Sequence, residues 1–329
     1  MPRLLTAIAV LAVALVGCGD DGTEALTVYS GRSETLVAPL IAQFEEETGI
    51  QVAVRYAGST ELAATILEEG GNSPADVFFA QDPASLGAVS GAGLFDRLAA
   101  ETLELSRPDF SDGEGSWVGI SGRARVLVYS TESVTELPMD RDDLLDAAWK
   151  GRIGIAPGNG SFLSFVAASI LLDGENATRA WLEGLAANDP VRFDGNSAIV
   201  AAVDSGEIDV GLVNHYYLLR LLDEKGSSTA ANHFFDAGGA AALVMPAGAG
   251  MLASSNNKDA ATEFIEFLLS SDAQAYYASE TFEYPLVPGI AASDALPPLD
   301  SLDAPEIDLG ELGAALDRAT ELVSEAGLL

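Results

Sequence analysis

The chain has 329 residues, of which 48% are hydrophobic, and two lobes of ordinary size would fit this length and composition. It carries 16 basic and 50 acidic residues, a net charge of −34, and so acidic a surface argues against a nucleic-acid partner. With one cysteine, an internal disulfide is impossible. We attribute the acidity chiefly to solubility, with a role in gathering cations as the alternative.

The N-terminal segment has the pattern of a signal peptide, residues 1–17. Arg3 precedes an apolar run at residues 4–16 that is too short to span a bilayer as a permanent helix. The run ends in a lipobox-like Leu-Val-Gly-Cys, which predicts cleavage before Cys18 and its lipidation; the alternative is a free thiol after ordinary cleavage. With residues 18–25 as tether, we expect a periplasmic or extracellular protein on the cytoplasmic membrane, held by acyl chains alone.

Beyond the tether, apolar strands alternate with amphipathic helices, which predicts an α/β fold with mainly parallel sheets. Ser33, Asp82 and Asn196 stand at predicted helix starts, and Pro83 strengthens the second of these. We expect strands at residues 26–29, 52–56, 75–80, 125–129, 152–156, 209–213 and 241–252. We expect helices at residues 34–48, 59–69, 162–172, 196–204, 218–225 and 259–269, and one starting at 83.

The chain is expected to pass between two lobes more than once. We assign residues 26–122 and 247–297 to lobe 1, and residues 123–246 and 298–329 to lobe 2. The segments at 123–129 and 241–252 then connect the lobes and are the expected hinges.

Two adjacent tyrosines, Tyr216 and Tyr217, follow the predicted strand at residues 209–213. Open α/β sheets bind ligands at the carboxyl ends of their strands. Phenolate oxygen is a hard donor that suits a hard trivalent cation, and a bound cation makes the phenol proton easier to remove. The alternative is that both rings only pack, and the residues alone leave the two interpretations open.

The helix predicted after residues 159–161 offers an anion site, because its free N–H groups and dipole favour negative charge. Arg123, and less directly Arg32, would add charge-assisted hydrogen bonds. The alternative is a helix start without a ligand. His215 and His233 are poor candidates for metal ligands and are expected to pack or to lie on the surface.

Seven motifs in order resemble the ferric-ion-binding proteins of bacterial ABC transporters, over nearly all of the mature length. They are LTVYSGR (26–32), FEEETGI (44–50), SPADVF (73–78), SGRARVLVY (121–129), WKGRIG (149–154), NHYY (214–217) and EYPL (283–286). The resemblance implies a two-lobed periplasmic-binding fold of type II that binds Fe(3+) in the cleft and delivers it to a permease. We expect a monomer.

The same resemblance implies roles for individual residues. Tyr216 and Tyr217 would ligate the iron, and a synergistic carbonate or phosphate would bind beside it. The residues implied for that anion are Asn159, Gly160, Ser161, Asn196 and Asn214.

The rest of the family's iron shell is changed in this sequence. Ser33 and Gln81 stand where one branch has histidine and glutamate, and Asn159 stands where another has a third tyrosine. Gln81 can offer only a neutral amide oxygen, and Tyr56 is a further candidate phenolate, with ordinary strand-end packing as its alternative. Exogenous anion or water must then complete the shell, or the ligand is not bare iron.

Two other functions compete with iron binding. The first is a binding protein of the same fold for an organic anion such as a phosphonate, held by the anion loop with the tyrosines lining the pocket. The second is an exported enzyme. The chain has no Gly-x-Ser-x-Gly, His-Glu-x-x-His or Walker motif and has two histidines, so we expect no enzymatic activity.

Overall fold

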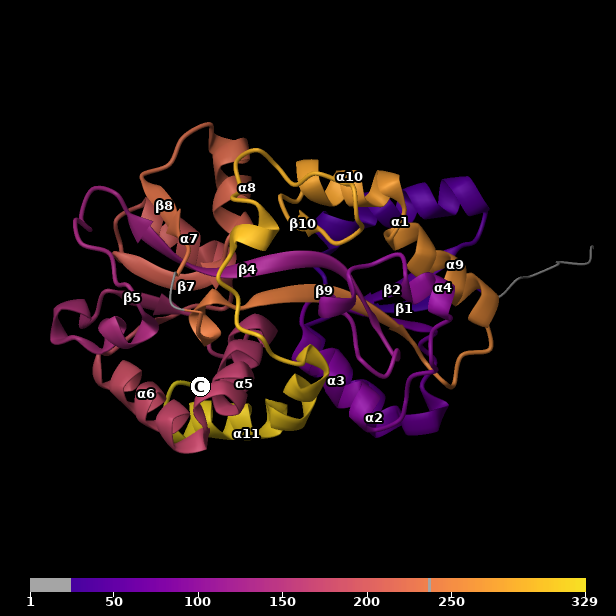
Figure 1. The fold of residues 1–329 in the computed structure, drawn as a ribbon, viewed down its shortest axis with the longest axis horizontal. Helices are drawn as coiled ribbons and strands as arrows, with labels where there is room; N and C mark the ends of the chain where they lie inside the picture. Colours follow the sequence, from indigo (N-terminus) through magenta and orange to yellow (C-terminus); the bar gives the residue numbers. More distant parts are fainter. Residues whose placement is uncertain (1–24, 236–237) are drawn as a thin grey trace, which may run out of the picture.

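The computed structural model describes residues 25–235 and 238–329, which form two α/β lobes joined by long strands (Figure 1). The predicted signal peptide, the lipidation at Cys18 and nearly all of the tether lie outside these residues. Within the described residues, no helix combines the length and apolar character needed to cross a membrane.

Lobe 1 is built on the parallel strands β1 (Leu26–Ser30), β2 (Val52–Tyr56) and β3 (Val77–Ala80), in the order β2-β1-β3. All residues of β3 are buried, as expected for a strand covered on both faces. Its helices are α1 (Glu34–Thr48), α2 (Ser59–Glu69), α3 (Pro83–Gly91), α4 (Ala100–Leu103), α9 (Lys258–Leu268) and α10 (Ser271–Ser279).

Lobe 2 repeats this scheme with β5 (Ile153–Ile155), which pairs in parallel with both β6 (Val191–Arg192) and β7 (Val210–Asn214). Its further strand is β8 (Ala230–His233), which pairs antiparallel with the strand that connects the lobes. Its helices are α5 (Gly160–Asp173), α6 (Glu175–Ala187), α7 (Asn196–Asp204) and α8 (Tyr216–Lys225).

Strand β4 (Val118–Ser130) belongs to both sheets. Its first half pairs antiparallel with β9 (Val244–Met251), which also pairs with β3, and its second half pairs antiparallel with β7. The short β10 (Tyr284–Pro285) adds another antiparallel pair. The expected two-lobed α/β architecture is therefore present, but each sheet is mixed rather than mainly parallel, because the strands that connect the lobes run against their neighbours.

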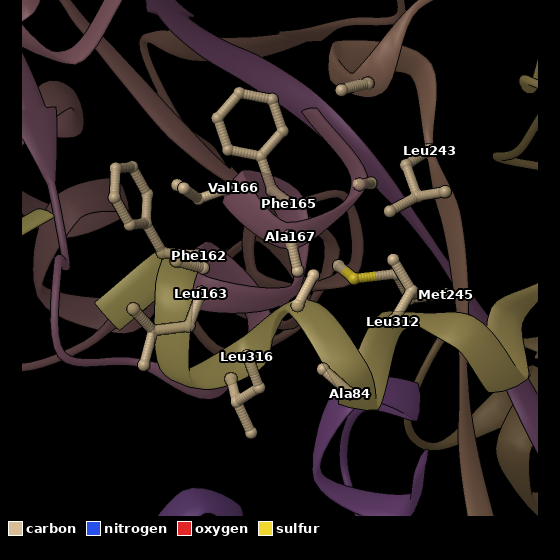
Figure 2. Packing of buried hydrophobic residues seen from close by; sticks show 14 of the residues in the cluster. Ala84, Phe162, Leu163, Phe165, Val166, Ala167, Leu243, Met245, Leu312 and Leu316 are labelled. Atoms are coloured by element: carbon tan, nitrogen blue, oxygen red, sulfur yellow. The ribbon is translucent and has the colours of Figure 1, made fainter. Parts of the chain in front are cut away.

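The C-terminal helix α11 (Leu312–Glu325) packs against α3 of lobe 1 and α5 of lobe 2. Figure 2 shows Leu312 and Leu316 of α11 among Ala84, Phe165 and other apolar side chains of one buried cluster. Glycines allow the close approach, because a Cβ added to Gly313 would lie 2.1 Å from the carbonyl carbon of Gly87. Helices of both lobes thus share one core under the connecting strands, while the exact lobe boundaries stay a prediction.

Three helix starts show how far the capping predictions hold. Asp82 caps α3 as predicted, accepting a hydrogen bond from the Ser85 N–H at 2.9 Å. Ser33 occupies the N-cap position of α1, but its side chain makes no capping hydrogen bond. Asn196 is the first helical residue of α7, and Gly195 takes the N-cap, so the prediction there was wrong by one residue.

Candidate functional site

The paired tyrosines lie where the chain leaves β7 and enters α8. Their rings stack with centroids 4.1 Å apart and planes 28° apart. Tyr216 is buried in the apolar cluster of lobe 1, although it comes from lobe 2, so the lobes meet at this ring. Burial, followed by the neighbouring Tyr217 phenol, raises the pKa of Tyr216 well above 10, against the opposing effect of Arg32 and Arg123. Tyr216 could therefore act as a phenolate ligand at neutral pH only if a bound cation displaced its proton.

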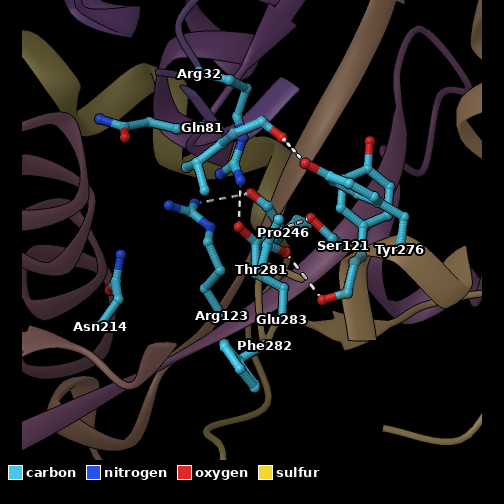
Figure 3. A network of polar contacts seen from close by, with 12 residues as sticks. Arg32, Gln81, Ser121, Arg123, Asn214, Pro246, Tyr276, Thr281, Phe282 and Glu283 are labelled. Atoms are coloured by element: carbon cyan, nitrogen blue, oxygen red, sulfur yellow. Dashed lines mark hydrogen bonds and ion pairs between the residues drawn. The ribbon is translucent and has the colours of Figure 1, made fainter. Parts of the chain in front are cut away.

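Arg32, in the loop after β1, is a buried cation with a buried partner. Its guanidinium forms an ion pair with Glu283, which also accepts a hydrogen bond from the Ser121 hydroxyl (Figure 3). Burial alone would lower the pKa of Arg32, but the Glu283 carboxylate, together with the Tyr216 and Tyr277 phenols, outweighs burial and the pKa is raised. The charge of Arg32 is thus compensated within the protein.

Arg123 and Arg125 on β4 are buried without such compensation. No carboxylate among residues 25–235 and 238–329 forms an ion pair with either, and Arg123 Nε and Arg125 Nη2 have no hydrogen-bond partner there. Burial, then the charge of Arg32, lowers the pKa of Arg123. Burial, then the charge of Arg123, lowers the pKa of Arg125 to about 9. Two buried positive charges therefore lack an anion.

Sequence reasoning singled out Arg123 but missed Arg125. The signal was present, because residues two apart on a strand point to the same face of the sheet. Arg123 Nη1 donates to Ser161 Oγ at 3.4 Å, and Arg125 Nη1 donates to Asn214 Oδ1 at 3.2 Å. Both arginines thus contact residues that the sequence assigned to the anion site.

The predicted anion residues of lobe 2 form one polar cluster at the start of α5. Asn159 Oδ1 accepts from the Ser161 N–H at 3.0 Å and caps the helix. Asn214 Nδ2 donates to Ser161 Oγ at 3.1 Å, and Asn196 Nδ2 lies 3.5 Å from Asn159 Oδ1. The structure thus brings together residues that are up to 55 positions apart in the sequence.

Gln81 and Asp82 of lobe 1 face this cluster. A Cβ added to Gly160 would lie 2.5 Å from Asp82 Oδ2 and 3.5 Å from Gln81 Nε2, so only glycine permits this approach between the lobes. The Gln81 N–H donates to Ser59 Oγ at 2.9 Å, which fixes the loop after β3 to the start of α2. The Gln81 side chain therefore lies beside the predicted anion loop.

Tyr56, the other further candidate for a metal ligand besides Gln81, is the last residue of β2 and is half-buried. It packs against the lobe 1 cluster that contains Tyr216, as Tyr217 also does. Burial, then the Glu34 carboxylate, raises the pKa of Tyr56. The Tyr56 ring thus belongs to the same apolar cluster as the paired tyrosines. This position agrees with a role as a metal ligand and equally with ordinary packing at the end of a strand.

The histidines are packed, as predicted. His215 is fully buried, its Nδ1 accepting from the Ala124 N–H at 3.0 Å and its Nε2 donating to the Phe282 carbonyl at 2.8 Å. Burial lowers the pKa of His215 to about 4. In the part of the chain that the structure describes, no group of three or more His, Cys, Asp or Glu residues could hold a metal ion. A metal here would depend on phenolates and on an added anion.

Comparison with known proteins gives consistent matches. The model of a bacterial extracellular solute-binding protein family matches residues 39–300. The chain is 34% identical to the Fe(3+)-binding periplasmic protein of Serratia marcescens, covering 93% of this chain and 91% of that protein. It is 36% identical to the major ferric iron-binding protein of Neisseria meningitidis serogroup B, and the match covers 97% of this chain and 98% of that protein.

The iron-bound structure of HitA from Pseudomonas aeruginosa is similar over 92% of this chain and 99% of that one. The TM-score is 0.88 and the sequence identity is 38%. This similarity confirms the two-lobed fold of type II that the sequence predicted. The named relatives are binding proteins, in agreement with the expectation that this chain has no enzymatic activity.

Proposed function

Because the chain belongs to the bacterial extracellular solute-binding protein family, we propose that it captures ferric iron, with a synergistic anion, between its lobes. The protein is a binding protein rather than an enzyme. Tyr216 and Tyr217 supply the phenolates, and residues 159–161 with Asn196 and Asn214 hold the anion. An ABC transporter permease receives the iron.

The observation that carries this proposal is the uncompensated charge beside a stacked tyrosine pair. Arg123 and Arg125 are buried, and the described residues offer them no ion-pair partner. Burying a charge is costly unless an opposite charge accompanies it. Phenolates formed at Tyr216 and Tyr217 lie in the electrostatic reach of these arginines, because both tyrosines act on the pKa of Arg123. Iron binding would form two phenolates near these arginines, and an accompanying anion would meet the positive charge that remains.

Counting charges shows why an anion is also needed. A ferric ion with two phenolates leaves one positive charge, and Arg123 and Arg125 raise this to three. The capped start of α5 and the hydroxyl of Ser161 then offer donors for a carbonate or phosphate. Gln81 adds a neutral oxygen at most. The anion therefore completes a shell that the protein alone leaves short of negative ligands.

The strands that connect the lobes support closure of the lobes on the ligand. Strands β4 and β9 connect the lobes, and bending at residues 123–129 and 241–252 would open the cleft. We place the protein outside the cytoplasmic membrane as a monomer, anchored through a lipid on Cys18. Cleavage before Cys18 would leave the binding lobes intact, because they lie beyond the tether.

A direct test is elemental analysis and a visible spectrum of protein purified from iron-supplemented medium. We expect one iron per chain and a tyrosinate-to-iron charge-transfer band. Colourless protein that takes up no ferric iron, even when carbonate or phosphate is supplied, would rule out the proposed function.

The buried arginines also favour a second candidate, an organic anion such as a phosphonate. That ligand would pair with Arg123 and Arg125 without needing phenolates. Calorimetry with a phosphonate and no iron distinguishes the two candidates. Binding of the phosphonate by iron-free, colourless protein would support the second candidate.

A further inference from the structure

The C-terminal helix α11 makes a contact between the lobes that lies outside the connecting strands β4 and β9. It packs against α3 of lobe 1 and also against α5 of lobe 2 (Figure 1). Any movement of one lobe relative to the other must therefore change the contact of α11 with at least one of them. The two contacts are built differently, and the difference indicates which one changes.

The contact of α11 with lobe 2 is fastened by side chains. Arg318 of α11 pairs with Glu175 of α6 at 2.6 Å, and Glu325 of α11 pairs with Arg179 of α6. Arg318 also pairs with Glu325 at 3.1 Å, so the four residues form a network. Within residues 25–235 and 238–329, no ion pair joins α11 to lobe 1. A network of charges holds its geometry better than an isolated exposed pair does. Helix α11 is therefore expected to move with lobe 2.

The contact of α11 with lobe 1 is made by backbone against backbone. A Cβ added to Gly87 of α3 would lie 2.7 Å from the carbonyl oxygen of Gly310 and 2.9 Å from the nitrogen of Gly313. A Cβ added to Gly313 would lie 2.2 Å from the nitrogen of Ala88. No side chain, not even a methyl group, fits between the helices at this point. The approach is thus as close as two helices can make, and only glycine permits it.

Such a contact can separate and form again at little cost. A surface groove borders it, and the lining of this groove includes the small residues Gly87, Ala88, Gly91, Gly313 and Ala314. Water therefore reaches the edge of the contact. Glycine and alanine expose little apolar surface when two helices part, so the separation loses little hydrophobic stabilisation. The ion pairs between α11 and α6 stay formed during the same movement.

We propose that the contact between Gly87 and Gly313, which we call the α3–α11 contact, forms when the lobes close on iron and separates when they open. The inference rests on the proposed function, because closure on iron is part of it. A contact that exists in the closed protein alone shifts the equilibrium towards the closed state. The α3–α11 contact thereby raises the affinity for iron, although neither glycine is among the proposed ligands.

The test places one methyl group in the contact, from either side. Gly87→Ala and Gly313→Ala each prevent the close approach that the closed protein needs. Overpacking of this kind should lower ferric affinity at least about tenfold, measured by competition with a chelator. The urea midpoint of the iron-free variants should not fall, because the contact is already separated there and alanine is the better helix former.

Gly91→Ala is the matched control on the same helix α3. A Cβ added to Gly91 would meet no other atom within 4 Å, so the methyl group enters open space. Ferric affinity of Gly91→Ala should equal that of the wild type. A loss of affinity in this control equal to that in Gly87→Ala would show that the methyl group acts on α3 itself, and would overturn the role of the contact.

The remaining outcomes separate this inference from the proposed function. Wild-type ferric affinity in Gly87→Ala and Gly313→Ala, with a lower urea midpoint of the iron-free proteins, would mean that the contact persists in the open protein. That result overturns the inference and leaves iron binding in place. Failure of the iron-free variants to fold overturns it for the same reason. Absence of iron binding by the wild-type protein overturns the proposed function itself.

Discussion

The two sides of the proposed site, which we call the lobe 1 wall and the lobe 2 wall, differ in how they would meet a ligand. The lobe 2 wall has two parts: a hydrogen-bonded cluster at the start of α5, and a pair of stacked phenols at the start of α8. The first consists of Asn159, Ser161, Asn196 and Asn214, and the second of Tyr216 and Tyr217. The lobe 1 wall consists of Arg32, Tyr56, Gln81 and Asp82, and its two charged members are already bonded within the protein. In the proposed site, lobe 2 would thus hold the ligand and lobe 1 would close over it.

This difference shows how a metal site could still bind its ligand when the side chains of one lobe supply few ligating groups. Gln81 is neutral, so it adds no charge to a metal shell. Arg123 and Arg125, on the strand between the two sides, have no ion-pair partner within residues 25–235 and 238–329 and would attract an anion instead. An exogenous ligand can take the place of side chains when buried charges are placed to hold it.

The largest expected effect is on the lobe 2 wall. Tyr216→Phe and Tyr217→Phe each delete one phenolate oxygen and keep the ring, so ligation is lost while packing is retained. We expect each to weaken ferric binding by several kcal/mol, on the order of a thousandfold, measured by competition with a chelator. Tyr56→Phe on the lobe 1 wall is the matched control and should change affinity less than about tenfold. A loss in Tyr56→Phe equal to that in Tyr217→Phe would contradict the division between the walls.

The next largest effect is expected at the buried ion pair between Arg32 and Glu283 in lobe 1. Glu283→Gln leaves Arg32 buried without its anion, which should cost about 3–5 kcal/mol of unfolding free energy. Asp300→Asn, in the solvent-exposed pair with Arg107, should cost at most about 1 kcal/mol. Urea denaturation of the iron-free proteins gives both values. Equal costs for the two variants would show that Glu283 does not compensate Arg32.

His215, beside the paired tyrosines, predicts a dependence of stability on pH. The pKa of His215 is about 4 in the folded protein against 6.5 for a solvent-exposed histidine, so between these values the unfolded chain binds a proton that the folded chain does not. The contribution of neutral, buried His215 to the free energy of unfolding is complete above pH 6.5. It is lost as pH falls towards about 4, and the total loss is about 3 kcal/mol.

His215→Gln keeps an acceptor and a donor but does not titrate, so it serves as the control. The unfolding free energy of the wild type minus that of the variant should decrease as pH falls from 6.5 to 4, because only the wild type loses stability there. A difference that stays constant over this range would show that His215 does not account for the loss.

The smallest effect is expected at Gln81 on the lobe 1 wall. Gln81→Ala removes a neutral oxygen from the ligand side, and we expect ferric affinity to fall by about 1 kcal/mol, roughly fivefold. Isothermal titration with ferric ion and phosphate measures it. A loss comparable to that of the tyrosine variants would make Gln81 a principal iron ligand.

Much of the lobe 2 wall could be predicted from the sequence because its signals are local. The tyrosines begin one residue after the end of β7, and Asn159 directly precedes the helix that it caps. The fold followed from alternating strands and helices together with ordered family motifs. Mixed pairing in the sheets was missed because the direction of β4 and β9 depends on their paths between the lobes.

The charge balance of the site could not be predicted, because it depends on contacts between distant residues. Arg32 and Glu283 are 251 positions apart, and Asp82 and Ser164 are 82 apart. No local pattern marks such pairs. The burial of Arg125 likewise depends on the packing of both lobes around β4, and only its position two residues from Arg123 hinted at a shared role.

The central claim is that Tyr216 and Tyr217 together ligate iron, and the chain contains its own control. Tyr276 and Tyr277 on α10 are also adjacent, with ring centroids 6.3 Å apart, and neither is a proposed ligand of the iron. The most direct measurement is the visible spectrum of ferric-loaded Tyr216→Phe/Tyr217→Phe beside that of Tyr276→Phe/Tyr277→Phe. We predict that the charge-transfer band disappears in the first variant and persists in the second. A full band and unchanged iron affinity in the first variant would contradict the claim.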